Sequence, residues 1–215
     1  ITGALLPQLN GSGSFTYNIQ KTAIAMPNFV NSMMPEAMRD PNASKYMTVT
    51  MGMDNIDLDY CSERGIFVQN ALGCTAGGVM NYVFSALYGV AARKRFRLDG
   101  ATMGIIGLGH TGRRVESMAI SLGIKVLRCD TLRAEAEGPQ GFSSLEEVLE
   151  QSDIVTMHVP LNEETRGMAD AYFFSKMKYG AFFINAARGE IVVEDDLVEV
   201  LKSGHLAGAA LDVTR

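Results

Sequence analysis

The chain has 215 residues, a formal net charge of −5 and three cysteines. Its length allows one full domain and part of a second, since a domain averages roughly 150 residues. A hydrophobic fraction of 47% with 20% charged residues is typical of a globular protein and excludes a disordered one. The acidic balance argues against a nucleic-acid partner, and no apolar run reaches the roughly 18 residues of a membrane helix.

Cysteine usage indicates the cellular setting. The three cysteines are odd in number and lack metal-ligand spacing, and no signal peptide is visible. We therefore predict a reduced, cytoplasmic protein without a metal site.

The sequence begins inside one strand-like or apolar run and ends directly after another. Ile1 lies inside an apolar run, and Arg215 directly follows the strand-like residues 208–213. We therefore expect the sequence to be a portion of a longer protein. Within residues 1–45 we expect a strand at 1–6 and a short helix at 33–38.

From residue 46 onward, strand-like and helix-like segments alternate. We expect strands at 46–51, 66–70, 103–107, 125–130, 154–159, 181–186 and 209–213, and helices at 58–64, 79–93, 110–122, 144–151, 171–177 and 194–202. Such alternation is typical of βαβ units and of a parallel sheet that is covered on both faces. A boundary ahead of the long helix predicts two domains, 1–69 and 70–215.

A glycine-rich motif gives the main functional signal. Gly107-Leu-Gly109-His-Thr-Gly112 follows a predicted strand and opens a predicted helix, which is the context of a dinucleotide fingerprint. Gly107 permits a tight turn, Gly109 permits close approach of a pyrophosphate, and Gly112 permits helix–sheet packing. These features predict a Rossmann-type doubly wound sheet.

Asp130 ends the next strand, 18 residues after Gly112. An acidic side chain there accepts hydrogen bonds from ribose hydroxyls and repels a 2′-phosphate, which favours NAD over NADP. The alternative is a structural glycine-rich turn followed by an exposed aspartate.

Three further polar residues follow apolar strands, where open α/β sheets bind ligands. Arg188 has the fork geometry that captures a carboxylate, and its alternative is a surface ion pair. His158 is a candidate general acid, although a structural or cofactor-supporting role is favoured. Asp212 is either a site residue or a turn carboxylate.

Several ordered motifs then resemble the D-isomer-specific 2-hydroxyacid dehydrogenases, a family that includes phosphoglycerate, glycerate and D-lactate dehydrogenases. Besides the glycine loop they are Gly52-Met-Asp-Asn-Ile-Asp57, Glu63-Arg-Gly-Ile66, Val68-Gln-Asn-Ala71, His158-Val-Pro-Leu161, Asn185-Ala-Ala-Arg-Gly189 and Gly208-Ala-Ala-Leu-Asp-Val213. The resemblance covers roughly residues 46–215, and Gly73-Cys74 followed by Tyr82-Val-Phe-Ser-Ala-Leu87 is similar to the erythronate-4-phosphate branch.

The resemblance implies roles for particular residues. Arg188 matches the catalytic arginine that holds the substrate carboxylate and polarises its 2-oxo group. The positions that match cofactor-binding residues are Gly107, Gly109, His110, Thr111, Gly112, Asp130, Val159, Pro160, Ala186 and Asp212. Those that match a loop facing the substrate are Thr50, Met51 and Gly52.

The chain also departs from the family pattern. The family's catalytic glutamate and histidine would follow after Arg215, and Asn81 stands where the family has a glutamate. The first domain is short for the flavodoxin-like substrate lobe that the resemblance implies, so we expect an incomplete lobe.

The resemblance implies an NAD-dependent oxidoreductase acting on a small D-2-hydroxy acid, possibly a phosphorylated one such as 3-phosphoglycerate or erythronate 4-phosphate. The alternatives are a non-catalytic NAD-binding regulator on the same fold and an unrelated Rossmann enzyme. The family also implies a homodimer built around the helix at 79–93, for which we predict Val83 and Leu87 as interface residues.

Overall fold

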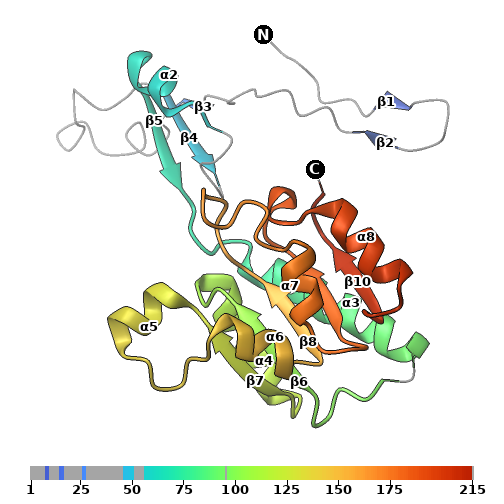
Figure 1. Cartoon of the computed structure of the whole chain (residues 1–215). Helices are drawn as coiled ribbons and strands as arrows, with labels where there is room; N and C mark the ends of the chain where they lie inside the picture. Colours follow the sequence, from blue (N-terminus) through green and yellow to red (C-terminus); the bar gives the residue numbers. More distant parts are fainter. Residues whose placement is uncertain are drawn as a thin grey trace. The chain divides into compact units, whose positions relative to one another are not determined.

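The computed structural model describes residues 8–9, 15–16, 26–27, 46–50, 56–94 and 96–214. The chain divides into two compact units, residues 1–72 and 73–215 (Figure 1). The strand expected at 1–6 and the helix expected at 33–38 lie outside the described residues.

The described residues of the first unit form two small sheets and one short helix. Strands β1 (Gln8–Leu9) and β2 (Phe15–Thr16) pair antiparallel, β3 (Met26–Pro27) pairs antiparallel with β4 (Tyr46–Thr50), and β4 pairs parallel with β5 (Ile66–Asn70). Helix α2 (Leu58–Glu63) connects β4 to β5, and the Asp57 side chain caps it by accepting a 2.9 Å hydrogen bond from the Tyr60 amide. The predicted parallel βαβ unit at 46–70 is therefore confirmed.

The second unit is built on a sheet of five described parallel strands. In chain order they are β6 (Thr102–Ile106), β7 (Lys125–Cys129), β8 (Ile154–Met157), β9 (Phe182–Asn185) and β10 (Gly208–Leu211). Their spatial order is β10-β9-β8-β6-β7. The chain thus builds outward from β6 to β7 and then returns to the other side of β6, which is the doubly wound topology that the sequence predicts.

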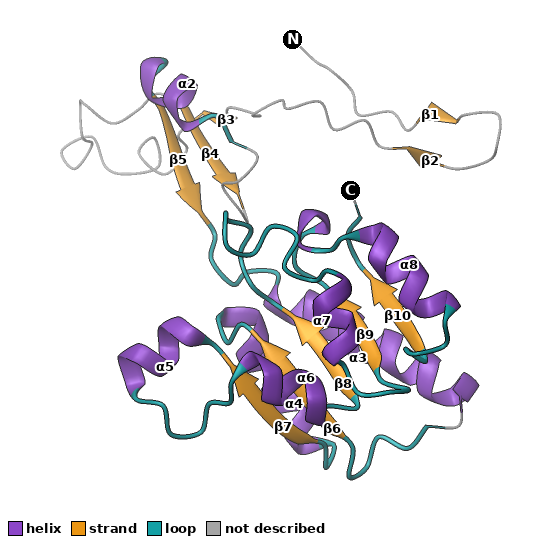
Figure 2. Cartoon of the chain, viewed as in Figure 1, coloured by secondary structure: helices purple, strands orange, loops and turns teal. Residues whose placement is uncertain are grey.

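Helices flank both faces of this sheet (Figure 2). One hydrophobic cluster includes side chains of α3 (Ala76–Lys94) and α4 (His110–Ser121), and the other includes those of α6 (Leu145–Gln151), α7 (Ala171–Lys176) and α8 (Glu194–Lys202). Adjacent strand residues alternate between the clusters, as in β6, where Ile105 belongs to the first and Ile106 to the second. Strands buried on both faces explain the continuous apolar runs in the sequence.

Among the described residues, two short helices were not predicted from the sequence. Helix α5 (Thr131–Glu137) buries none of its residues, so it carries no apolar periodicity, and the 3-10 helix η2 (Gly189–Ile191) is one turn long. The carboxylate of Asp130 caps α5 by accepting from the Arg133 amide at 3.1 Å.

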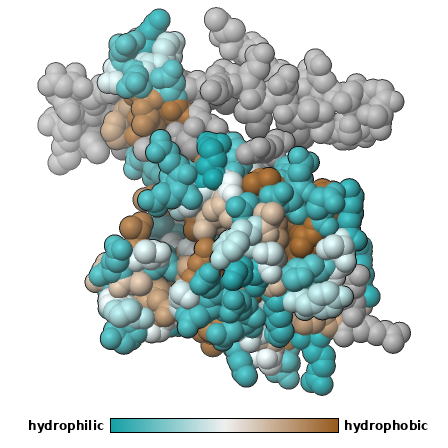
Figure 3. Space-filling model, in the orientation of Figure 1, coloured by the Kyte–Doolittle hydropathy of each residue, from teal (hydrophilic) through white to brown (hydrophobic). Residues whose placement is uncertain are grey.

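The predicted dimer residues are wrong. The side chains of Val83 and Leu87 are 0% and 1% exposed, because this face of α3 packs in the core of its own domain. Among the large apolar side chains of α3, Tyr88 is instead exposed, at 49%. The face of the larger unit seen in Figure 3 is mainly hydrophilic, with smaller hydrophobic areas.

Candidate functional site

The site residues follow one row of paired residues across the sheet. The backbone register aligns Cys129, Ile106, Met157, Asn185 and Leu211 at the carboxyl ends of five neighbouring strands. The residues that come next in the chain are Asp130, Gly107, His158, Ala186 and Asp212. Parallel pairing therefore brings together, at one edge, residues that are far apart in the sequence.

The glycine loop is shaped by close backbone packing. Gly107 has a φ of +91°, and a Cβ there would lie 2.8 Å from the His158 carbonyl oxygen and 2.9 Å from the Val159 nitrogen. A Cβ at Gly112 would overlap the carbonyl oxygen of Gly107. Both glycines are thus required by the protein's own packing.

Gly109 differs from these two glycines because a Cβ there would meet no atom within 4 Å. It is the N-cap of α4, no side chain caps that helix, and its first turn holds no acidic residue. The amides of His110 and Thr111 therefore lie at the positive end of the helix dipole, next to a glycine with open space on its Cβ side. This arrangement fits a pyrophosphate.

Asp130 connects the glycine loop to α5. Its Oδ2 accepts a 2.7 Å hydrogen bond from the Leu108 amide, and its Oδ1 accepts from the Arg133 amide at 3.1 Å. Each carboxylate oxygen has a further lone pair, so Asp130 retains the capacity to accept from a ribose hydroxyl.

His158 is held as a neutral side chain. Burial lowers its pKa to about 4. Its Nε2 lies 3.0 Å from the Thr156 hydroxyl, and its buried Nδ1 has no hydrogen-bond partner among the described residues. A group with so low a pKa is a poor proton acceptor at neutral pH, which supports the structural alternative over the general acid.

Arg188 projects from a turn that a buried side chain organises. Asn185 is 0% exposed, its Nδ2 donates to the Arg188 carbonyl oxygen at 2.8 Å, and its Oδ1 accepts from the Ala187 amide at 3.1 Å. One Arg188 nitrogen, Nη1, donates to the Ala187 carbonyl oxygen at 2.9 Å. Asn185 was not among the site residues predicted from the sequence, although its place in the motif with Arg188 was the available signal.

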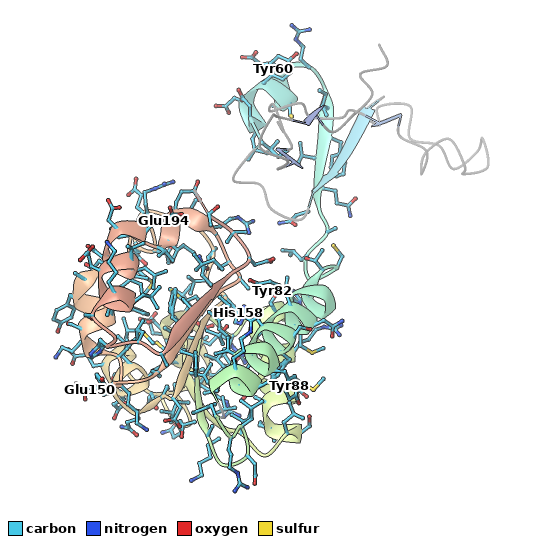
Figure 4. All side chains as sticks on the ribbon, turned by 90° about the vertical axis from the view of Figure 1, so that its right-hand side faces the viewer. Tyr60, Tyr82, Tyr88, Glu150, His158 and Glu194 are labelled. Carbon is cyan, nitrogen blue, oxygen red and sulfur yellow. The ribbon has the colours of Figure 1, made fainter. Side chains whose placement is uncertain are left out.

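The exposed residue Asp212 is tied to the same turn, because its amide donates to the Asn185 carbonyl oxygen at 2.9 Å. Burial raises the pKa of Tyr82 on α3, and the negative charge of Asp212 raises it further. Figure 4 labels Tyr82 and His158 among the side chains of this unit. The charge of Asp212 therefore raises the pKa of a partly buried tyrosine, which was not among the site residues predicted from the sequence.

The other predicted residues are placed as follows. Val159 and Pro160 continue the loop after His158, where the Pro160 carbonyl oxygen accepts from the Thr165 hydroxyl at 2.6 Å. Thr50 is the last residue of β4 in the first unit, whereas Met51 and Gly52 lie outside the described residues.

Within the described ranges, no three His, Cys, Asp or Glu residues are grouped so that they could hold a metal ion. The helices described here include none with the length and hydropathy needed to cross a membrane.

Comparisons with known proteins agree with this geometry. Residues 87–215 match the family model of the D-isomer specific 2-hydroxyacid dehydrogenase NAD-binding domain. Erythronate-4-phosphate dehydrogenase of Bacteroides fragilis is 41% identical over 170 residues, which is 77% of this chain and 49% of that protein. The chain thus spans about half the length of the curated relatives that it matches.

Solved structures of the family are also similar to this chain, among them the following two. D-Lactate dehydrogenase of Aquifex aeolicus, complexed with NAD and lactic acid, has a TM-score of 0.67 and 31% identity, covering 79% of this chain and 58% of that one. The NAD+-bound 3-phosphoglycerate dehydrogenase of Entamoeba histolytica has a TM-score of 0.68 and 28% identity, covering 78% and 57%.

Proposed function

Because the chain belongs to the D-isomer-specific 2-hydroxyacid dehydrogenases, we propose that it is part of an NAD-dependent oxidoreductase acting on a small D-2-hydroxy acid. The observation that carries this proposal is the single row of strand ends that gathers the glycine loop, Asp130, the Arg188 turn and Asp212. Each of these four parts has chemistry suited to a different portion of the cofactor or substrate.

The cofactor side of the site uses the glycine loop and its neighbours. The amides of His110 and Thr111 bind the pyrophosphate beside Gly109, and Asp130 accepts from the adenosine ribose. Asp212 orients the nicotinamide carboxamide, and the remaining cofactor contacts come from Val159, Pro160 and Ala186. NAD, when bound, supplies the hydride acceptor.

Arg188 acts on the substrate. Its guanidinium binds the 2-hydroxy acid carboxylate and stabilises negative charge that develops on the C2 oxygen. We assign no part in the accompanying proton transfer to His158, since burial leaves it a weak base.

The proposed function also implies an assignment of the two domains. Residues 70–215 form the NAD-binding domain, and residues 1–69 contribute part of a flavodoxin-like substrate lobe. Thr50, Met51 and Gly52 belong to a loop of that lobe that faces the substrate.

A phosphorylated acid is the proposed substrate class. Erythronate 4-phosphate is the first choice, since the Bacteroides fragilis relative carries that activity in its name, and 3-phosphoglycerate is the second. The test is a steady-state assay of the full-length protein with NAD and a panel of phosphorylated and unphosphorylated D-2-hydroxy acids. We expect turnover with a phosphorylated acid. NAD binding without turnover on any acid in the panel would instead indicate the non-catalytic regulator.

The protein is further proposed to be a homodimer built around α3, as the family resemblance implies, and to be cytoplasmic, as the cysteine usage indicates. The exposed Tyr88 replaces Val83 and Leu87 as the residue to test. Light scattering should give a dimer mass for the full-length protein and a smaller mass for Tyr88→Glu. A monomer at micromolar concentration would contradict this proposal.

A further inference from the structure

We infer that Glu137 helps to determine the choice of cofactor, by occupying an arginine that would otherwise bind the 2′-phosphate of NADP. This inference rests on the NAD site proposed above. It concerns the short helix α5, which the sequence analysis did not predict and to which it assigned no role.

The guanidinium of Arg133 donates hydrogen bonds to two groups of the protein. Its Nε donates to Glu137 Oε1 at 2.9 Å, and its Nη2 lies 2.6 Å from Oε1 and 2.7 Å from Oε2 of the same carboxylate. Its Nη1 donates to the Leu108 carbonyl oxygen at 3.0 Å. The fork that suits a phosphate is therefore already engaged by a carboxylate.

This ion pair lies beside the ribose-binding aspartate. The amide of Leu108 donates to Asp130, and the carbonyl of Leu108 accepts from Arg133, so one residue of the glycine loop joins both charged groups. The same residue, with Arg113, Arg133 and Glu137, lines a pocket of about 320 Å³. A phosphate on the ribose 2′-oxygen would therefore lie close to the charged side chains of this pocket.

The pocket holds cations whose charge is already compensated. Arg113, Arg128 and Arg133 line it, Arg128 pairs with Glu116, and Glu137 lies 3.8 Å from Arg113 Nη2 in addition to its contact with Arg133. A 2′-phosphate would have to displace Glu137 or accept its repulsion. The ribose hydroxyl of NAD meets no such penalty.

An ordinary surface role for Glu137 predicts a different result. A pair at i and i+4 on an exposed helix contributes little to stability and has no effect on cofactor choice. Glu135 on the same helix provides a matched control, because it is exposed and its side chain makes no hydrogen bond or ion pair with the described residues. Glu137→Gln and Glu135→Gln remove the same charge from α5.

The experiment measures the dissociation constants of NADH and NADPH by fluorescence titration of the full-length protein at low salt, without substrate. We expect Glu137→Gln to tighten NADPH binding about tenfold and to change NADH binding less than about threefold. Glu135→Gln should leave both constants near those of the wild type. Adding Arg133→Gln to Glu137→Gln should abolish the gain for NADPH.

Equal NADPH affinities of Glu137→Gln and Glu135→Gln would overturn the inference, as would a gain that persists without Arg133. In either case, NADH binding by the wild type would leave the proposed function standing. A wild type that binds no NADH would remove the cofactor site and the inference together.

Discussion

The side-chain amide of Asn185 donates a 2.8 Å hydrogen bond to the carbonyl oxygen of Arg188, while its backbone carbonyl accepts from the Asp212 amide at 2.9 Å. One fully buried residue thus connects the proposed substrate-binding arginine to the proposed nicotinamide-binding aspartate. Its two side-chain hydrogen bonds close the turn that leads from β9 to Arg188.

Asn185→Ala should displace this turn. We expect kcat/KM for the 2-hydroxy acid to fall at least about tenfold and the free energy of unfolding to fall by about 2 kcal/mol, since a part-buried carbonyl and a buried amide lose their partner. Asp170→Ala removes a comparable side-chain-to-backbone bond at the start of α7, 2.9 Å from the Phe173 amide. It should reduce stability by about 1 kcal/mol and leave kcat/KM unchanged.

Arg188→Lys tests the substrate contact directly. Lysine keeps the charge but loses the planar fork, so we expect kcat/KM to fall about a hundredfold while NADH affinity changes little. Steady-state kinetics and calorimetry separate the two effects. An unchanged kcat/KM would remove Arg188 from the mechanism.

Gly109→Ala tests the pyrophosphate site independently of substrate. The added Cβ meets no protein atom within 4 Å, so stability should fall by less than about 1 kcal/mol. It fills the space that a phosphate approaches, so the NADH dissociation constant should rise about tenfold. Gly89→Ala, in the middle of α3 and equally free of neighbours, should leave NADH binding unchanged.

Asp130→Asn tests the preference for NAD. Asparagine still caps α5, so the fold should be retained, but the charge that repels a 2′-phosphate is lost. We expect the ratio of NADH to NADPH affinity, measured by calorimetry, to fall about tenfold. A clear preference of the wild type for NADPH would contradict the role given to Asp130.

Much of this architecture could be predicted because its signals are local. Strands such as β6 and β9 are continuous apolar runs, and the glycine motif identifies the turn after β6. Helix α5 could not be predicted because it buries no residue, and Val83 and Leu87 were assigned to an interface because an apolar helix face does not reveal which surface covers it. The role of Asn185 depends on the backbone of a turn, which composition and periodicity do not describe.

His158 should make the stability of the fold depend on pH. Its pKa is about 4 in the folded protein and near 6.5 in an unfolded chain, so between these values the unfolded state binds more protons. The contribution of the neutral histidine is therefore fully present above about pH 6.5 and is lost as the pH falls toward 4. From pH 7.5 to pH 5 the loss is about 2 kcal/mol. Urea unfolding at both pH values should show that the wild type loses about 2 kcal/mol more than His158→Gln does. An NMR titration of the His158 ring should place its midpoint near pH 4, and a midpoint near 6.5 would contradict its burial as the cause.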